Sequence, residues 1–255
     1  MAIEQKTIRS IGELLESLGP ICRRAKIVWF RGHSDSSWHL EPQLSRKGLL
    51  DSEMQLMKRF KQNAFQFLPH VPQDEWEWMF LMQHYGVYTR LLDWTESPLF
   101  GLYFALLEDC FKPKSRKPPA ALWCLFPRKL NEASGLVLNP PDDIPAFGDD
   151  KELNDYLPTN IQGQSASTRG PLAIIVPRQF GRVYAQLGVA TIFHKGAKRI
   201  EDLEDTHQRQ EHLVKLNIPR NSVSRLKREL ALLKVDRLTV FPQLENVAAH
   251  AIEGV

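Results

Sequence analysis

Arg31 is the residue of this chain whose position most directly suggests binding chemistry. It lies at the end of AKIVWFRG (25–32), whose β-branched and aromatic residues predict a buried strand. A guanidinium there is costly to bury unless an anion or a carbonyl receives it, and its fork of N–H donors matches a phosphate or carboxylate at two points. The adjacent Gly32 lets a ligand or a backbone segment come close. In the alternative interpretation, Arg31 pairs with an interior Asp or Glu.

A second group of polar residues lies just before the apolar segment SPLFGLYFALL. Thr95 and Ser97 stand where a helix is predicted to begin, and the free N–H groups and dipole of a helix N-terminus favour a negatively charged ligand. His84 could hold a ribose hydroxyl or cap the preceding helix. Arg90 and Asp93 predict a local ion pair that fixes the chain before the helix.

The third candidate is Gln186, within RVYAQLGVATIF (182–193). Its amide is surrounded by aliphatic residues and must therefore find hydrogen-bond partners. If the segment is a strand, alternation places Tyr184, Gln186 and Gly188 on one face. The alternative interpretation is a core glutamine that is satisfied by its neighbours.

Several kinds of site have no support in the sequence. It contains no phosphate-binding P-loop, no dinucleotide-binding G-x-G-x-x-G turn, no H-E-x-x-H helix and no G-x-S-x-G elbow. We expect no metal site, because the histidines and carboxylates form no complete ligand set. His33 and His39 flank Asp35, and this leaves open the hypothesis of a nuclease that uses histidine as acid and base.

Composition narrows the class of protein further. The chain has 255 residues, 43% hydrophobic and 25% charged, with a net charge of +3, which is ordinary for a folded protein. No stretch reaches the ~18 apolar residues that cross a bilayer, and the N-terminus resembles no secretory signal. Cys22, Cys110 and Cys124 are odd in number and widely spaced, so we expect no disulfide framework and a cytoplasmic location.

Hydrophobic periodicity predicts both helices and strands. The class is α+β, because the strands and helices do not alternate strictly. We expect a single domain, 1–255, with a helical insert at about 51–110 and a mobile or irregular section at about 127–170. Helices are predicted to begin at Ser10 (ending at Gly19-Pro20), Asp51, Asp74, Ser97, Ser222 and Leu244, and strands are predicted over 25–32, 121–126, 172–177, 183–196 (around a Gly188 turn), 213–219 and 237–243.

Four ordered blocks of this sequence resemble the bacterial FRG domain family. They are FRGH (30–33), TRLLDWTESPLFGLYFA (89–105), RVYAQLGVATIF (182–193) and the segment from IPRN to ENVA (218–248). The resemblance covers about residues 10–250. The sequence departs from the family at Tyr88, where the family commonly has proline before the Thr-Arg pair.

A weaker resemblance links the order of these elements to ADP-ribosyltransferases, and it implies a mixed sheet core of that type. It implies that Arg31 holds NAD and acts with Gln186 in catalysis. It implies a cofactor-binding set of Arg31, Gly32, His84, Arg90, Thr95 and Ser97. Many transferases have a glutamate in the final block, where this chain has Gln186-Leu187-Gly188, so Glu96 or Asp93 would have to supply an acid.

The resemblance favours an NAD-consuming transferase that modifies a nucleic acid or a protein. Such a protein would be a toxin, held in check by an antitoxin protein, in a toxin–antitoxin or phage-defence system without a membrane partner. The alternative is a non-catalytic module that binds a nucleotide or nucleic acid through Arg31, Arg90, Trp38 and Trp94, by phosphate contacts and base stacking.

Overall fold

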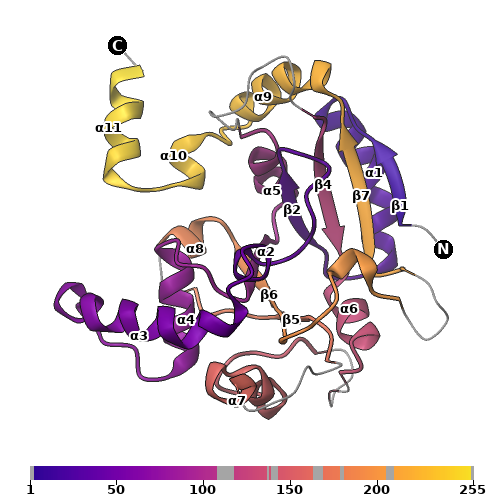
Figure 1. Ribbon diagram of the computed structural model, residues 1–255. Coiled ribbons are helices and arrows are strands. Elements are labelled where there is room, and N and C mark those ends of the chain that lie inside the picture. The colour runs from indigo at the N-terminus through magenta and orange to yellow at the C-terminus, as the bar shows by residue number, and fades with distance from the viewer. Residues whose placement is uncertain are drawn as a thin grey trace.

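The computed structural model describes residues 3–107, 118–136, 138, 143–162, 169–178, 181–204 and 210–253 (Figure 1). Within these residues the fold is mixed α+β, as the sequence predicts: one seven-stranded sheet with helices packed around it. No helix in this described part combines the length and the apolar character needed to cross a membrane. The single-domain boundary stays a prediction.

The sheet combines parallel and antiparallel pairs in the order β1-β7-β4-β2-β3-β6-β5. β1 and β7 run parallel, and the other neighbouring strands are antiparallel. The strands are β1 (Glu4–Thr7), β2 (Trp29–His33), β3 (Leu91–Thr95), β4 (Ala120–Leu125), β5 (Leu172–Ile174), β6 (Gly188–Ile192) and β7 (Leu213–Ile218).

Three of the predicted helix starts are fixed by local capping. The side chains of Ser10, Asp74 and Ser97 each accept a hydrogen bond from the backbone N–H three residues later, which satisfies a donor that the helix itself cannot. The helices are α1 (Ile11–Arg24), α2 (Gln43–Arg46), α3 (Glu53–Ala64), α4 (Glu75–His84), α5 (Pro98–Ala105), α6 (Pro127–Ala133), α7 (Pro158–Gln162), α8 (Gly181–Ala185), α9 (Val223–Leu232), α10 (Arg237–Val240) and α11 (Leu244–Glu253).

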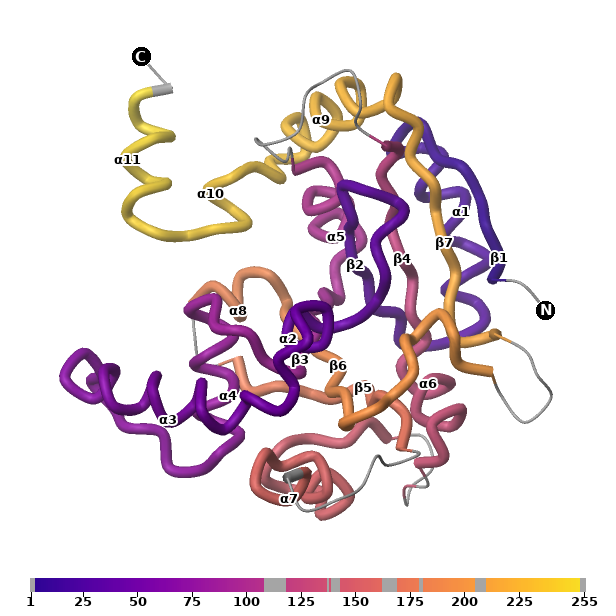
Figure 2. The backbone as a smooth tube through the Cα atoms, viewed as in Figure 1, coloured from indigo at the N-terminus to yellow at the C-terminus, as the bar shows by residue number. Residues whose placement is uncertain are grey.

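The sheet is least tightly paired between β2 and β3. Only Phe30 and Thr95 are paired in register there, whereas β2 pairs with β4, and β3 with β6, along their whole lengths. The sheet therefore has two halves, β1-β7-β4-β2 and β3-β6-β5, which separate beyond this one pair. Figure 2 shows the second half lying below the first. We call the opening between β2 and β3 the split.

Apolar clusters cover both faces of the sheet, and one of them joins its two halves. α1, α5 and α9 cover one face of the first half, where they pack on Phe30 and Leu122. On the other face, Trp29 and Trp123 share a buried cluster with Trp94 of β3, so apolar packing joins the halves beyond the single backbone pair of Phe30 and Thr95. α3 and α4 cover the second half. Burial of this kind is the main stabilising term in folding.

The first helix does not end at Gly19-Pro20, contrary to the prediction. α1 continues to Arg24 with Pro20 inside it. Proline removes one helical N–H donor, but the next residue, Ile21, is fully buried in the core. Burying a side chain of this size stabilises by about 1.5–3 kcal/mol. Tertiary packing therefore stabilises the helix beyond Pro20, although Gly19-Pro20 is a local signal for a helix end.

Two segments predicted as strands are helical. Residues 183–187 belong to α8 and the turn after it, so Tyr184, Gln186 and Gly188 do not alternate along a strand. The segment 237–243 begins with α10, because Asp236 and Thr239 cap each other's backbone N–H groups in a capping box. In both cases short-range hydrogen bonding outweighs the β-branched and aromatic composition.

The helical insert and the irregular section are only partly as expected. The segment 51–110 supplies α3, α4 and α5, but it also supplies β3, a central strand of the sheet. The section 127–170 contains α6 and α7 and a 3₁₀ turn at 151–156. Residues 108–110, 137, 139–142 and 163–168 of these two segments lie outside the described part of the chain.

Lys234 offers a direct test of backbone strain. It follows α9 with φ +58°, and the N–H groups of Lys234 and Val235 bond back to the carbonyls of Ala231 and Leu230, as in a Schellman motif. A side chain in this left-handed conformation costs roughly 1 kcal/mol, and glycine avoids that cost. We expect Lys234→Gly to raise the free energy of unfolding, measured in urea. A lower stability would contradict this assignment.

Candidate functional site

Arg31 lies in the split, and among the described residues no ion pair joins it to an interior acid. Its Nη1 donates to the backbone carbonyl of Asp93 at 2.5 Å, and its Nε donates to Nε2 of His33 at 3.1 Å. The guanidinium thus bridges from β2 to β3 where the strands have stopped pairing. Burial lowers the pKa of Arg31 to about 10; the Asp93 charge raises it, and nearby Arg46 lowers it further. Arg31 and Arg46 thus place two guanidiniums near the split, and an anion bound there would add to the attraction that Asp93 already supplies.

His33 holds Arg31 only weakly. Its Nδ1 faces the indole N–H of Trp123 at 3.2 Å, while its Nε2 faces the N–H of Arg31. Burial, together with the Arg31 charge, lowers the pKa of His33 to about 3, so the ring is neutral at pH 7. A neutral imidazole has one acceptor nitrogen and one N–H. It can therefore accept from Trp123 or from Arg31, but not from both.

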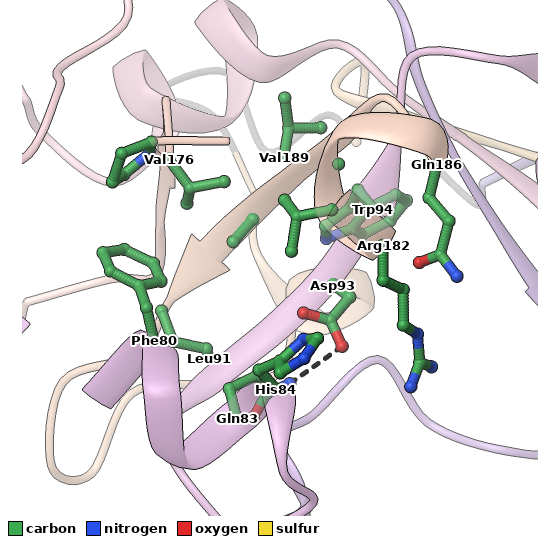
Figure 3. Close-up of a pocket in the computed structure, with 14 residues that line it drawn as sticks. Phe80, Gln83, His84, Leu91, Asp93, Trp94, Val176, Arg182, Gln186 and Val189 are labelled. Atoms are coloured by element: carbon green, nitrogen blue, oxygen red, sulfur yellow. Dashed lines mark hydrogen bonds between the residues drawn. The ribbon is translucent and has the colours of Figure 1, made fainter. Parts of the chain in front are cut away.

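A small cavity opens beside the split, on the side of β3 and β6. Its volume is about 80 Å³. Figure 3 shows that its polar side chains come from α4, from β3 and from the segment that contains α8. The residues that line it include Phe80, Gln83, His84, Asp93, Trp94, Val176, Arg182, Gln186 and Val189. We call this cavity the β3–α8 pocket.

The carboxylate of Asp93 is held at the mouth of this pocket. The amide of Gln83 donates to it at 2.8 Å (Figure 3). Thr89 in turn donates to Gln83 at 2.5 Å. The side chain of Asp93 is exposed, so a ligand can reach it. Beside it, burial and the Arg182 charge lower the pKa of His84, which makes that ring a neutral group at pH 7.

Gln186 lines the same pocket from the other side. Its side-chain amide donates to the carbonyl of Val240 at 3.0 Å. Arg182 stacks on Phe241, with 4.8 Å from its guanidinium carbon to the ring centre. The next residue, Leu187, has φ +49°, a strained conformation for leucine. The loop is thus fixed from α10, and the side-chain oxygen of Gln186 is left for other contacts within the described structure.

Thr95 joins the Gln186 loop to the start of α5. Its hydroxyl donates to the carbonyl of Gln186 at 2.6 Å and accepts the N–H of Ser97 at 3.0 Å. The hydroxyl of Ser97 accepts the N–H of Phe100 as the cap of α5. These contacts bring Thr95, Ser97 and the Gln186 loop together at the start of α5. Arg31 is linked to this neighbourhood through the backbone carbonyl of Asp93, two residues before Thr95.

Arg90 does not belong to this neighbourhood as a ligand-binding group. It is 1% exposed, and its guanidinium donates to Glu53 at 2.7 Å and to the carbonyls of Phe193 and Tyr156 at 2.6 Å each. The predicted Arg90–Asp93 ion pair is also wrong. Arg90 directly precedes β3 and Asp93 lies within it, three residues later. Residues an odd number apart along a strand point to opposite faces, so the two side chains diverge.

Gly32 likewise has a structural role. A Cβ at this position would lie 2.2 Å from the backbone nitrogen of Ala105 and from the carbonyl oxygen of Gly101. Of the two partners that the sequence left open, a ligand or a backbone segment, the structure places a backbone segment there. The glycine lets α5 pack directly on β2.

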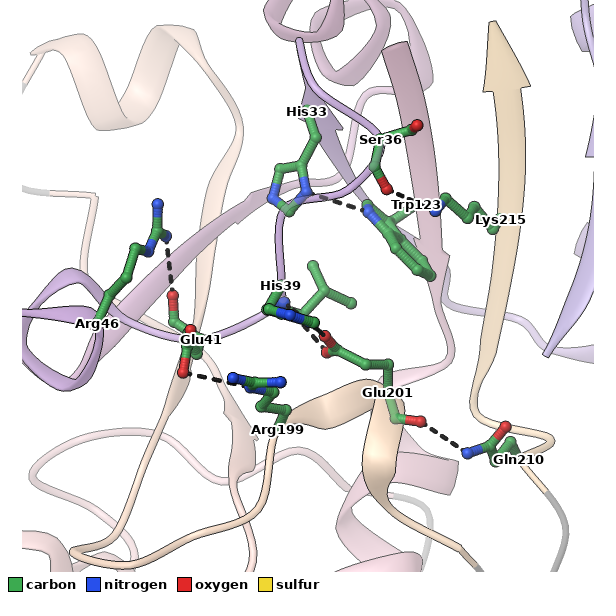
Figure 4. A network of polar contacts seen from close by, with 11 residues as sticks. His33, Ser36, His39, Glu41, Arg46, Trp123, Arg199, Glu201, Gln210 and Lys215 are labelled. Carbon is green, nitrogen blue, oxygen red and sulfur yellow. Dashed lines mark hydrogen bonds and ion pairs between the residues drawn. The ribbon is translucent and has the colours of Figure 1, made fainter. Parts of the chain in front are cut away.

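The histidines of the nuclease hypothesis do not meet in one site. His39 is half-exposed and pairs with Glu201 at 2.8 Å, whereas His33 faces Trp123 (Figure 4). With its pKa near 3, His33 is a poor acid or base at neutral pH. The binding-module alternative also loses support, because Trp94 is 4% exposed and donates its indole N–H to Thr191, and so offers no face for stacking.

One pocket residue, Arg182, was not a candidate in the sequence analysis. It stands at the start of the block RVYAQLGVATIF, where a charged residue opens an otherwise apolar segment. That is the same signal that pointed to Arg31. The helix α8 turns Arg182 towards His84 and Gln186, as Figure 3 shows.

Comparison with known proteins identifies one domain. The family model of the FRG domain matches residues 26–113, which include β2, the split, α3 to α5 and Arg31. No curated protein and no solved structure gives a significant match. The matched region ends before the Gln186 loop. The α4 and β3 side of the β3–α8 pocket therefore lies within the match, and the side that contains Gln186 lies outside it.

Proposed function

This chain carries an FRG domain, and from that premise we propose that it is an ADP-ribosyltransferase-like protein that consumes NAD and transfers ADP-ribose to a nucleic acid or a protein. The observation that carries the proposal is the position of Arg31. Its guanidinium lies in the split, bonded to a carbonyl and to a neutral histidine, with the β3–α8 pocket adjacent.

The split and the pocket suit different parts of NAD. Arg31, with Arg46 close by, supplies the donors and positive charge that a diphosphate needs. The pocket, at about 80 Å³, has room for a single small ring, since sites that enclose drug-sized ligands measure about 300–1,000 Å³. In the proposal, the nicotinamide end enters this pocket and the diphosphate lies outside it, against Arg31.

The transfer breaks the bond between the ribose carbon and the nicotinamide nitrogen, and the electron pair leaves with nicotinamide. Positive charge then develops on the ribose. Asp93, held by Gln83, lies where it could stabilise that charge. Glu96 is a weaker candidate because it is paired with Arg178. An acceptor oxygen or nitrogen then bonds to the ribose carbon and loses its proton. Gln186 would orient the ribose through its side-chain oxygen.

The role as a toxin restrained by an antitoxin, in a toxin–antitoxin or phage-defence system, is part of the proposal. Its support is the family resemblance alone. It adds one requirement to the chemistry: the acceptor must be a macromolecule on which growth depends.

We expect purified protein to release nicotinamide from NAD in the presence of a cell lysate, and Arg31→Ala to reduce the rate by roughly 100-fold, the loss typical of one group that stabilises charge during reaction. Arg31→Lys should fall between the two, since it keeps the charge but loses the fork. Liquid chromatography of nicotinamide is the measurement.

The matched control is Arg225→Ala, which removes an exposed arginine on α9 and should leave the rate unchanged. Circular dichroism of each variant separates loss of fold from loss of chemistry. Binding of NAD or nucleic acid that weakens steeply with salt, without any nicotinamide release, would instead support the binding module.

A further inference from the structure

In the described part of the chain, two apolar surfaces are exposed: one is concave, and the other is one side of a helix. One is a groove between α3 and the turn that follows α4, with a volume of about 580 Å³. Its lining is mainly apolar, with Leu56, Phe60, Phe67, Tyr85 and Val87, and includes the polar residues Arg59 and Asn63. Phe67 is 76% exposed and Tyr85 64%. Contiguous apolar surface of this sort marks an interaction site. We call it the α3–α4 groove.

The second surface is one side of α11. Leu244, Val247, Ala248, Ala251 and Ile252 recur at the spacing that places them on one side of a helix. All are exposed, Leu244 at 83% and Ile252 at 77%. This is the pattern with which an amphipathic helix enters an apolar groove.

The base of α11 is fixed, so the helix is presented in one orientation. Asn246 accepts from Arg237 at 2.6 Å and donates to the carbonyl of Phe241 at 2.8 Å. α10 is in turn held to the Gln186 loop through the carbonyl of Val240. A preordered helix loses less entropy on docking than a flexible tail.

The charges around the two surfaces are complementary. Residues 241–255 contain two glutamates and no lysine or arginine. α3 carries Lys58, Arg59 and Lys61, of which Arg59 lines the groove itself, and its acid, Glu53, is buried against Arg90. Opposite charge of this kind favours a specific orientation and a faster encounter.

We propose that the protein forms a homodimer in which α11 of each copy docks in the α3–α4 groove of the other. A second copy is the occupant because one chain carries both the groove and the helix that fits it. Figure 1 shows α11 and α3 projecting on the same side of the molecule, where a two-fold axis can exchange them reciprocally.

Sedimentation velocity of the full chain over about 1–100 μM tests this. We expect a dimer that Phe67→Glu, in the groove, and Val247→Glu, on α11, each weaken by at least about tenfold in Kd. Leu232→Glu, at an 82% exposed leucine of α9, is the matched control and should remain a dimer.

Mixing the two weakened variants gives a further result. Each variant alone has both contacts substituted, whereas the mixed pair keeps one intact contact, the α11 of Phe67→Glu in the groove of Val247→Glu. Because a buried glutamate abolishes the contact in which it stands, the doubly substituted contact has nothing further to lose, and the mixed pair should associate more tightly than either variant alone. A monomer at every concentration, including one whose α11 folds back on its own groove, would overturn the proposal. So would a dimer that neither substitution weakens.

Discussion

Arg90→Met is expected to lower the free energy of unfolding by about 3–5 kcal/mol, the range for removing one partner of a buried ion pair. Arg90 is 1% exposed, and its guanidinium satisfies Glu53 and two backbone carbonyls. Removing it takes a donor away from each of these three buried acceptors. Because domains of this kind are stable by only about 5–15 kcal/mol, much of the variant should be unfolded in mild urea.

The pH dependence of the stability of Arg90→Met shows whether the unpaired Glu53 carboxylate causes the loss. Burial raises the pKa of Glu53 even beside Arg90, and without that arginine nothing opposes the effect. The folded state then binds the carboxyl proton more tightly than the unfolded state, so stability falls as pH rises above the ordinary glutamate pKa. The loss of unfolding free energy relative to the unsubstituted protein should therefore be smaller at acidic pH. The double variant with Arg90→Met and Glu53→Gln should recover part of that loss.

Lys195→Met is the control for loss of a positive charge. Lys195 pairs with Asp51 on the surface, where 85% of the aspartate side chain is exposed. Exposed pairs contribute at most about 1 kcal/mol. If urea unfolding finds Arg90→Met no less stable than Lys195→Met, the buried network is not what holds α3 to the sheet.

Gly32→Ala is expected to destabilise the protein by about 3 kcal/mol, the upper end of the range for overpacking. The added Cβ would lie 2.2 Å from two backbone atoms of α5, one of them the Ala105 nitrogen. Backbone cannot rotate away as a side chain can, so α5 must move off β2. The start of α5 at Ser97 would move with it, and nicotinamide release should fall together with stability.

Gly12→Ala also adds one methyl group, but it is expected to raise the stability of the protein. Gly12 lies in α1, and its added Cβ would meet only the Ser10 hydroxyl at an ordinary 3.6 Å. Alanine in a helix is more stable than glycine by about 1 kcal/mol. Thermal unfolding of both variants is the measurement, and a Gly32→Ala protein as stable as Gly12→Ala would contradict the close approach of α5.

Arg31 and Arg90 show why sequence patterns alone could not assign the site. Each stands beside an apolar segment, and each is expected to need an anion or carbonyl. The partner of Arg90 is Glu53, 37 residues away, on a helix whose position depends on the whole second half of the sheet. The guanidinium of Arg31 donates to a backbone carbonyl and to a histidine instead, because β2 and β3 stop pairing beside it.

The sequence by itself determined the α+β class, the FRG resemblance and the starts of the helices at Ser10, Asp74 and Ser97. These depend on hydrogen bonds and periodicity within a few residues, which local sequence contains. Tertiary structure alone decided that α1 runs through Pro20, that Gln186 follows a helix, that Gly32 faces α5 and that Arg90 is buried. Those outcomes depend on which distant segments compete for the same core, and that competition is settled only when the chain packs.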